Sequence, residues 1–247
     1  MNPICGSFGL LKKLNDDNLT VLMAVYNGES YIRTAIDSIL NQTYKQFRFL
    51  IVDDASTDST RNIIESYDDQ RIDMLCLENN IGQTAALNVG LKHIETSWVA
   101  RMDADDYSST TRLAKQMRLV TENPSISCIG TWAWTFRDDP KVIEGEVVTQ
   151  LNHQDIKRAL LRGSPIIHGS LLVKLSALND IGGYDERYRY AADVELYDRL
   201  LINCISVNIP EQLLGIRRHS SQGAHTTLAL DEGIEILSKS RSAVPHE

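Results

Sequence analysis

The chain contains 247 residues, with 33 acidic against 25 basic side chains and a formal net charge of −8 at pH 7. A domain of this length buries roughly 70–75% of its unfolded surface, so it can form a hydrophobic core without disulfide bonds. The acidic balance provides no basic face of the kind that binds phosphate backbones, and we therefore expect no nucleic acid partner.

Targeting and redox signals favour a cytoplasmic protein. The sequence has no run of about 18 apolar residues, as a transmembrane helix would need. Residues 1–18 lack the long apolar stretch of a signal peptide. The four cysteines form no CxxC pair, so a zinc or thioredoxin-like site is not indicated and a reduced setting is expected.

The first half of the chain alternates short apolar runs with segments of helical spacing. The runs predict strands at residues 19–25, 47–52, 72–77 and 98–102, and the spacing predicts helices at 30–42, 57–67 and 82–94. Strands that alternate with helices in this way form parallel βαβ units. The carboxyl ends of such strands meet at one edge of the sheet, which is where ligands bind.

Three of the predicted strands are followed by polar residues. Tyr26 follows the first strand, Asp53 and Asp54 follow the second, and the run Asp-Ala-Asp-Asp at residues 103–106 follows the fourth. We therefore expect these side chains to share one cleft at the ligand-binding edge of the sheet.

The second half is less regular. Its spacing predicts helices at residues 113–121, 155–161, 193–202 and 228–237, and strands at 126–131 and 169–173. The adjacent glycines Gly182 and Gly183 predict a turn or loop. Because there is no repeat, low-complexity tract or linker, one domain with two functional halves is favoured.

The acidic run at residues 103–106 is the candidate metal site. Mg²⁺ and Mn²⁺ prefer oxygen ligands, often one or two carboxylates completed by substrate phosphates. A solvated acidic loop is the alternative. Asp53 and Asp54 would bind a base or ribose, or would turn the chain, and Tyr26 would stack on a base or lie on the rim. The run Asn-Asn-Ile-Gly at 79–82 would open a helix whose N-terminus favours a phosphate, or would only cap that helix.

Several competing motifs are absent. GxGxxG and GxxxxGK[ST] do not occur, which removes the usual dinucleotide and P-loop fingerprints. A calcium loop starting at Asp103 would need Gly at position 108 and Glu at position 114, where the chain has Ser108 and Ala114.

The strand-end motifs together resemble those of the inverting family 2 glycosyltransferases, which have the GT-A fold. The match runs from about residue 19 to about residue 219, and its pieces occur in the family's order. They are AVYNG at 24–28, SILNQT at 38–43, VDDASTD at 52–58, NNIG at 79–82, ALNVGL at 86–91, ARMDADD at 100–106, RL at 112–113, PIIH at 165–168, GGYD at 182–185, AD at 192–193 and RRH at 217–219.

The resemblance implies an α/β fold of the GT-A type. It consists of a single Rossmann-like, mostly parallel sheet flanked by helices, with a smaller mixed sheet on the acceptor side. Residues 1–247 would form one domain. Within it, 19–106 would bind the nucleotide sugar, 107–225 would bind the acceptor, and 226–247 would form a C-terminal helix and tail.

The resemblance also implies site residues. Asp193 matches the catalytic base, Asp105 the metal ligand, and His219 a position close to the metal or diphosphate. Tyr26 and Asp54 would contact the base of the donor, and Asp53 its loop or ribose. The further expected substrate contacts are Ala24, Gly82, Asp103 and Ala104 on the donor side and His168, Gly183 and Tyr184 on the acceptor side.

Two positions depart from the family pattern. Ala192 stands where an acid commonly precedes the base, which makes Glu195 the alternative to Asp193. Leu87 stands where a basic residue is common, and Arg101 or Arg217 could supply the missing phosphate contact.

The implied activity is metal-dependent, inverting sugar transfer with Mn²⁺ or Mg²⁺. The donor would be a nucleotide diphosphate sugar, with a UDP-sugar expected. The acceptor would be a hydroxyl of a glycan or lipid-linked saccharide in surface polysaccharide (lipopolysaccharide or capsule) synthesis. The location would be cytoplasmic, with peripheral contact at the inner face of the cell membrane left open. The alternatives are a nucleotidyltransferase and a noncatalytic nucleotide-sugar-binding module.

Overall fold

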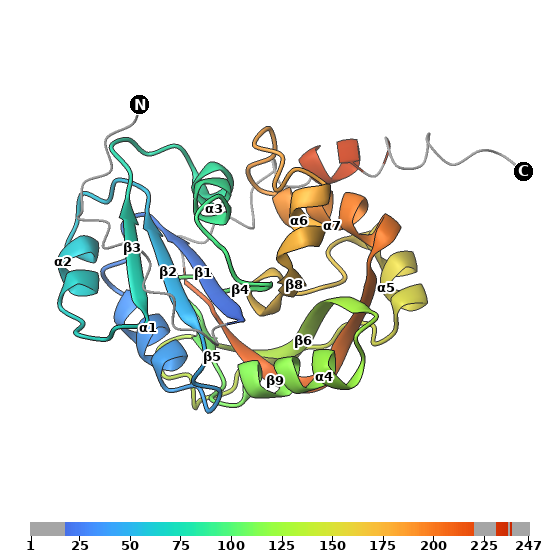
Figure 1. The fold of residues 1–247 in the computed structure, drawn as a ribbon, viewed down its shortest axis with the longest axis horizontal. Helices are drawn as coiled ribbons and strands as arrows, with labels where there is room; N and C mark the ends of the chain where they lie inside the picture. The colour runs from blue at the N-terminus through green and yellow to red at the C-terminus, as the bar shows by residue number, and fades with distance from the viewer. Residues whose placement is uncertain (1–17, 220–230, 237, 239–247) are drawn as a thin grey trace, which may run out of the picture.

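The computed structural model describes residues 18–219, 231–236 and 238. Figure 1 shows its helices and strands. The strands are β1 (Leu19–Val25), β2 (Arg48–Asp53), β3 (Ile72–Cys76), β4 (Trp98–Arg101), β5 (Tyr107–Ser108), β6 (Ile126–Phe136), β7 (Gly145–Val147), β8 (Leu172–Lys174) and β9 (Ile205–Arg217). The α-helices are α1 (Ile32–Leu40), α2 (Thr60–Glu65), α3 (Gln83–Leu91), α4 (Arg112–Glu122), α5 (His153–Ala159), α6 (Leu175–Asp180) and α7 (Ala192–Asn203). Short 3₁₀ turns span Leu160–Arg162 and His168–Ser170.

The strands form one sheet in the order β3-β2-β1-β4-β8-β6-β9-β5, with β7 paired to β6. The first four strands are parallel, as the βαβ pattern predicts. The strands beyond β4 run in both directions. The smaller mixed sheet that was expected on the acceptor side is therefore continuous with the parallel half.

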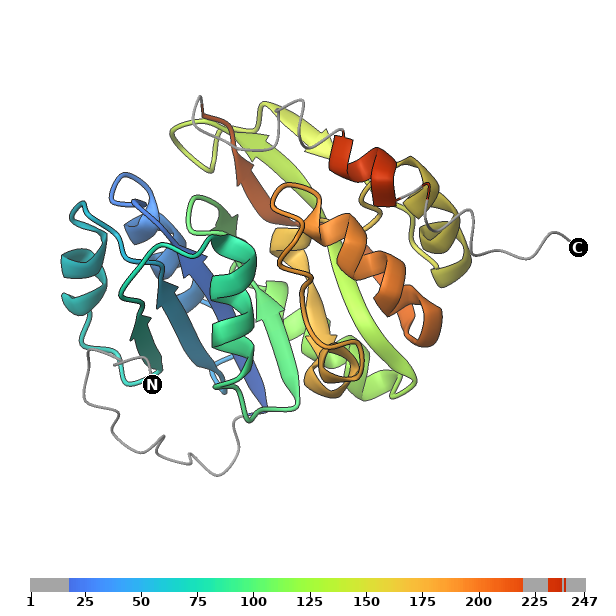
Figure 2. The same ribbon diagram turned by 90° about the horizontal axis from the view of Figure 1, so that it is seen from above.

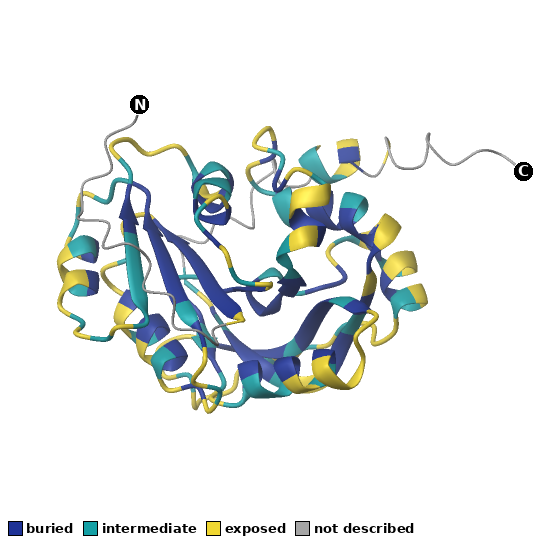
Figure 3. Cartoon of the chain, in the orientation of Figure 1, coloured by how far each residue is buried: buried dark blue, intermediate teal, exposed yellow. Residues whose placement is uncertain are grey.

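The two faces of the sheet are covered by different helices (Figure 2). Successive side chains of a strand point to opposite faces, so β1 contributes to two separate core clusters. Leu22 and Ala24 pack in the cluster that includes α3, α6 and α7. Val21 and Met23 pack in the cluster that includes α1 and α4. Burial on both faces explains why β1 is almost entirely apolar. In Figure 3 the strand is dark blue, the colour of buried residues.

The predicted elements of the first half are confirmed, with α1, α2 and α3 each shorter than predicted at both ends. The prediction missed β9, the long strand beside β6. A proline inside an apolar run argues against a strand, and Pro210 lies in β9 where its register with β6 shifts between Thr131 and Trp132. The hydrogen bonding between β6 and β9 is interrupted at this point, so the missing N–H of the proline breaks no bond between the strands.

Two other predictions need correction. The strand predicted at 169–173 begins later, because residues 168–170 form a 3₁₀ turn that places His168. Of the helix predicted at 228–237, residues 231–236 are helical, while 228–230 and 237 lie outside the described residues. Within the part of the chain that the structure describes, no helix has the length and apolar character needed to cross a bilayer.

Candidate active site

The loops after β1 and β2 are bound to each other at the carboxyl edge of the sheet. The Asn27 backbone N–H donates to the Ser56 hydroxyl at 2.9 Å, and the Thr57 N–H donates to the Asn27 side-chain oxygen at 2.8 Å. Tyr26 is the first residue after β1 and is 49% exposed. An aromatic side chain held open at this edge can stack on a base.

The two carboxylates after β2 are both buried, at 2% exposure each. Asp54 accepts the backbone N–H groups of Ile81 at 2.8 Å and Gly82 at 2.9 Å, one on each carboxylate oxygen. Asp53 accepts the Ser56 N–H at 3.3 Å. Burial raises the pKa of Asp54 above 3.8, and the two backbone donors oppose this rise. Asp54 therefore fixes the start of α3 against the end of β2.

The three carboxylates of the acidic run after β4 lie in different environments. Asp103 is paired with Arg101. Asp105 lies with its Oδ2 2.9 Å from His219 Nε2, and its side chain is 30% exposed. Asp106 is buried and accepts the Arg217 N–H at 3.0 Å. Burial and the neighbouring carboxylates raise the pKa of Asp106 well above its ordinary value.

Buried arginines offset the negative charge of this run. Arg112 has no exposed surface, and its Nη1 donates to the carbonyl oxygens of Gly169 at 2.5 Å and Arg101 at 3.2 Å. Burial lowers the pKa of Arg112 to about 10, so its guanidinium keeps its charge at neutral pH. Arg101 and Arg112 thus stabilise clustered carboxylates that would otherwise repel one another.

The residues present fit a divalent cation that is completed by substrate. Within the described residues, no three His, Cys, Asp or Glu side chains come together as a ligand set. Asp105 and His219 form a two-member set that is still partly open to solvent. Mg²⁺ and Mn²⁺ are commonly held by one or two protein ligands, with phosphate and water supplying the others. Asp105 and His219, called the half-site below, could therefore supply the protein ligands of such an ion.

A polar pocket of about 160 Å³ lies beside the acidic run, between α3 and the start of α7. Four of the predicted site residues line it, namely Asp103, His168, Tyr184 and Asp193. Its other lining residues are Gln83, Thr84, Leu87, Arg101, Arg189, Tyr190 and Ala192. The fold thus brings the predicted donor side and acceptor side together around one volume.

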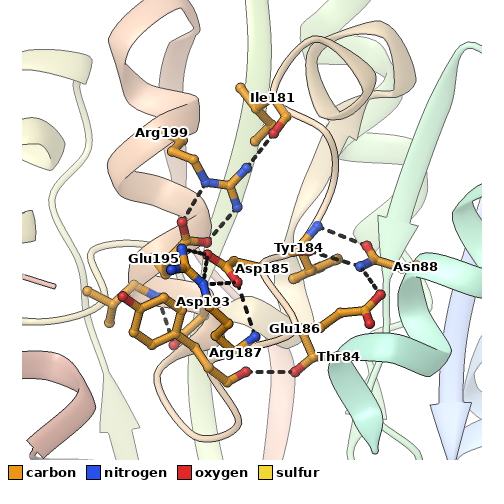
Figure 4. A network of polar contacts seen from close by, with 12 residues as sticks. Thr84, Asn88, Ile181, Tyr184, Asp185, Glu186, Arg187, Asp193, Glu195 and Arg199 are labelled. Atoms are coloured by element: carbon orange, nitrogen blue, oxygen red, sulfur yellow. Dashed lines mark hydrogen bonds and ion pairs between the residues drawn. The ribbon is translucent and has the colours of Figure 1, made fainter. Parts of the chain in front are cut away.

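Asp193 lines this pocket and Glu195 does not. Figure 4 shows both side chains near the start of α7. Glu195 is buried and accepts from Arg199 Nε at 2.6 Å, one turn further along α7. Arg199 also donates to the Ile181 carbonyl oxygen at 2.6 Å. Glu195 is thus held by an ion pair, so of the two candidate bases Asp193 is the one that lines the pocket. Burial raises the pKa of Asp193 above 3.8, and hydrogen bonds from Ser164 and the Val194 N–H oppose the rise.

His168 and Tyr184 lie next to each other in the lining of the pocket. His168 Nε2 lies 2.7 Å from the Tyr184 hydroxyl oxygen. Burial, assisted by the charge of Arg101, lowers the pKa of His168 well below 6.5. The imidazole is therefore neutral at pH 7.

The loop that carries Tyr184 is fixed to α3 by Asn88. The Asn88 side-chain oxygen accepts the Tyr184 N–H, and its nitrogen donates to the Tyr184 carbonyl oxygen, both at 2.9 Å (Figure 4). Gly183 precedes Tyr184 with φ +76°, and a Cβ there would lie 2.7 Å from the Asn88 oxygen. Gly183 also lines a second pocket, of about 500 Å³, between α3 and this loop.

Gly182 provides a matched control for Gly183. It has φ +77°, but a Cβ there would meet nothing within 4 Å. Both Gly→Ala changes incur the cost of a left-handed residue, roughly 1–2 kcal/mol, while only Gly183→Ala also collides with Asn88. We expect urea denaturation to show Gly183→Ala as the more destabilised variant. Equal losses of stability would contradict the steric role of Asn88.

The remaining predicted residues have mixed placements. Ala24 is 6% exposed and its side chain belongs to the core of the sheet. The Ala104 Cβ lies 4.0 Å from a Cβ built at Gly28, so the loops after β1 and β4 meet. Arg217 is buried, and its guanidinium donates to the carbonyl oxygens of Asp105 and Arg137. Arg217 therefore supports the loop instead of lining the pocket.

Sequence reasoning missed part of the pocket wall. Arg189 and Tyr190 line the pocket, yet neither belongs to a motif. Their position between the Gly-Gly loop and Asp193 was the available signal. Arg101, one of the two arginines that the sequence offers for the missing phosphate contact, lines the pocket, as does Leu87.

Comparison with known proteins identifies the family of this chain. The family profile described as Glycosyl transferase family 2 matches residues 20–182. EpsE of Bacillus subtilis (strain 168) is 30% identical over 208 residues, covering 82% of this chain and 73% of EpsE. The O-antigen biosynthesis glycosyltransferase WbnJ of Escherichia coli is 30% identical over 226 residues, covering 87% of this chain and 85% of WbnJ.

Two solved structures show the shared fold. S. aureus TarS 1-349 in complex with UDP-GlcNAc has a TM-score of 0.75 at 20% identity, over 93% of this chain and 68% of TarS 1-349. The mannosyltransferase PcManGT from Pyrobaculum calidifontis, in complex with GDP-Man and Mn²⁺, has a TM-score of 0.70 at 20% identity, over 93% of this chain and 66% of that chain. The GT-A fold expected from the sequence is thereby confirmed. The profile match and the two bacterial relatives show that this chain is a glycosyltransferase and belongs to glycosyl transferase family 2.

Proposed function

We propose that the protein transfers a sugar from a nucleotide diphosphate sugar, with a UDP-sugar as the expected donor, to a hydroxyl of a glycan or lipid-linked saccharide. The observation that carries the proposal is the shared pocket of Asp103 and Asp193, beside the Asp105–His219 pair. The solved neighbours bind UDP-GlcNAc and GDP-Man. The relative WbnJ is named for O-antigen biosynthesis, which supports a role in surface polysaccharide synthesis.

The proposed reaction is a single displacement that inverts the anomeric configuration. Tyr26 would stack on the base at the open edge of the sheet, and the N-terminus of α3, fixed by Asp54, would face the phosphates. Asp193 would accept the proton of the attacking hydroxyl, a form of assistance typically worth about 10²–10⁴-fold. The bond from the anomeric carbon to the diphosphate oxygen breaks as the acceptor oxygen forms its bond.

Asp105 and His219 are the residues that would hold the divalent cation. When bound, Mn²⁺ or Mg²⁺ supplies Lewis-acid stabilisation of the negative charge on the leaving diphosphate. Arg101, buried against Asp103 in the pocket wall, adds fixed positive charge near the same group. Arg101 would thereby replace the basic residue whose usual place Leu87 occupies.

A thermal-shift screen of nucleotide sugars with Mn²⁺ or Mg²⁺ tests this proposal, because a ligand that binds only the folded state raises its stability. We expect UDP-sugars with metal to give the largest shifts, followed by release of UDP when an acceptor glycan is added. Release of pyrophosphate from a nucleoside triphosphate would instead identify a nucleotidyltransferase. Tight binding with neither transfer nor hydrolysis would identify a noncatalytic binding module.

A further inference from the structure

The segment at residues 231–236 contacts the loop that leads into α7. The Glu232 carboxylate accepts three consecutive backbone N–H groups of that loop. Its Oε1 accepts from Arg189 at 3.1 Å, and its Oε2 accepts from Tyr190 at 2.8 Å and Ala191 at 2.9 Å. In Figure 1 this segment is drawn in red and α7 in orange, because the segment follows α7 in the chain.

Glu232 supplies what the start of α7 lacks. The N-cap residue of α7 is Ala191, whose methyl group cannot accept a hydrogen bond. The N–H groups around a helix start have no partner within the helix, and a side-chain oxygen normally satisfies one of them. A carboxylate at this end is also stabilised by the positive pole of the helix dipole. Glu232 therefore satisfies the N–H of Ala191 at the N-cap of α7 together with the two loop N–H groups before it.

The segment that carries Glu232 is itself fixed in the core. Ile236 is 3% exposed and belongs to the same buried cluster as Tyr188 and Ala191. The Tyr188 hydroxyl donates to Glu235 at 3.4 Å. Packing already orders the backbone that carries Glu232. Its carboxylate can therefore hold the loop at a smaller cost in conformational entropy than a carboxylate on an unpacked segment.

The loop held by Glu232 forms part of the pocket. Arg189 and Tyr190 line the pocket, and Asp193 follows Ala191 by two residues at the first turn of α7. We propose that Glu232 is a positioning residue, which holds the acceptor-side wall and the Asp193 carboxylate in their working geometry. This inference rests on the proposed function, since it assigns Glu232 to the same reaction.

The test compares Glu232→Gln with Asp231→Asn, a matched removal of one carboxylate from the neighbouring exposed residue. Gln offers one accepting oxygen and a donating nitrogen, so it cannot accept all three N–H groups. Glu232→Asp, which keeps the carboxylate, is the conservative variant. The substrate is the best of UDP-glucose, UDP-galactose, UDP-GlcNAc and GDP-mannose, with Mn²⁺ and with water as the acceptor.

We expect Glu232→Gln to lower kcat about tenfold or more, because small misplacements of a catalytic group carry penalties up to about 10²-fold. The donor KM and the Kd of UDP measured by calorimetry should stay near the wild-type values. Glu232→Asp should recover most of the lost kcat, and Asp231→Asn should match the wild type. Hydrogen exchange in the peptide covering 187–193 should rise in Glu232→Gln alone.

Three outcomes would overturn the inference. One is unchanged kcat in Glu232→Gln, with or without faster exchange in the loop. Another is a parallel loss of UDP affinity and kcat, which would indicate general loss of structure. The third is exchange at 187–193 that does not respond to Glu232→Gln. A wild-type protein that turns over none of the four donors would count against the proposed function, and the exchange comparison would still decide whether Glu232 holds the loop.

Discussion

The Asp193→Asn variant should lose at least about 10²-fold in turnover, the loss typical of removing a general base. Its affinity for UDP should stay close to that of the wild type, because Asp193 lies on the pocket wall formed by α7, away from the loops after β1 and β2. Asn keeps the size of the side chain and can still accept from the Val194 N–H, which now lies 2.9 Å from the carboxylate. Steady-state kinetics and calorimetry with UDP and Mn²⁺ measure the two effects separately.

Two variants of the same helix serve as controls. Asp198→Asn removes a partly exposed carboxylate further along α7, and it should leave turnover unchanged. Glu195→Gln breaks the ion pair with Arg199, so it should lower stability more than turnover. A loss of UDP affinity in Asp193→Asn at constant turnover would reject the base assignment.

The pH dependence of turnover provides an independent check on Asp193. Burial raises its pKa above 3.8, so its carboxylate takes up a proton at a higher pH than an exposed aspartate does. A base must be deprotonated, and turnover should therefore fall as the pH decreases through this raised pKa. The acid limb of the kcat profile should disappear from the residual activity of Asp193→Asn. An unchanged acid limb in that variant would assign it to another group.

The Asp105→Ala variant should abolish metal-dependent sugar transfer and leave the fold intact. Loss of the carboxylate leaves His219 as the remaining member of the half-site, and one imidazole is a poor site for Mg²⁺ or Mn²⁺. The fold should tolerate the change because burial and the charge of Asp103 already disfavour the ionised carboxylate and raise the pKa of Asp105. Transfer assays over a Mn²⁺ series, with a melting temperature for each protein, measure both effects.

Asp138→Ala is the control for Asp105→Ala. It removes an exposed carboxylate from the loop after β6, so Mn²⁺-dependent transfer should continue at the wild-type rate. Full activity of a folded Asp105→Ala protein would remove Asp105 from the metal site. A large fall in its melting temperature would instead indicate a structural role for the carboxylate.

The parallel half of the fold was predictable because its signals are local. Each of β1 to β4 is a short apolar run, and α1 has a clear apolar face of helical spacing. The same reasoning placed the acidic run and Asp53–Asp54 at one edge of the sheet, since parallel strands end on the same side. The mixed half was harder, because β9 owes its place to pairing with β6, which is distant in the chain. Its local sequence, which includes Pro210, argues against a strand.

The sequence could not decide between members of a chemically equivalent pair. Asp193 and Glu195 are both carboxylates near the start of one helix, and only the Arg199 ion pair separates them. Arg101 and Arg217 are both arginines next to motifs, and their distinct roles depend on which carbonyl and carboxylate groups surround them. Which residue of each pair takes a given role depends on the direction of its side chain. Contacts between distant segments of the chain determine that direction.

By itself, therefore, the sequence determined the family and the parallel core and supplied most of the candidate site residues, because apolar periodicity and motif order act over short stretches of chain. Only the tertiary structure decided that Asp193 lines the pocket, that Asp54 fixes the start of α3, and that Glu232 satisfies the N–H at the N-cap of α7. These arrangements arise where packing brings separate segments together to satisfy buried charges and helix ends, and no local pattern encodes such contacts.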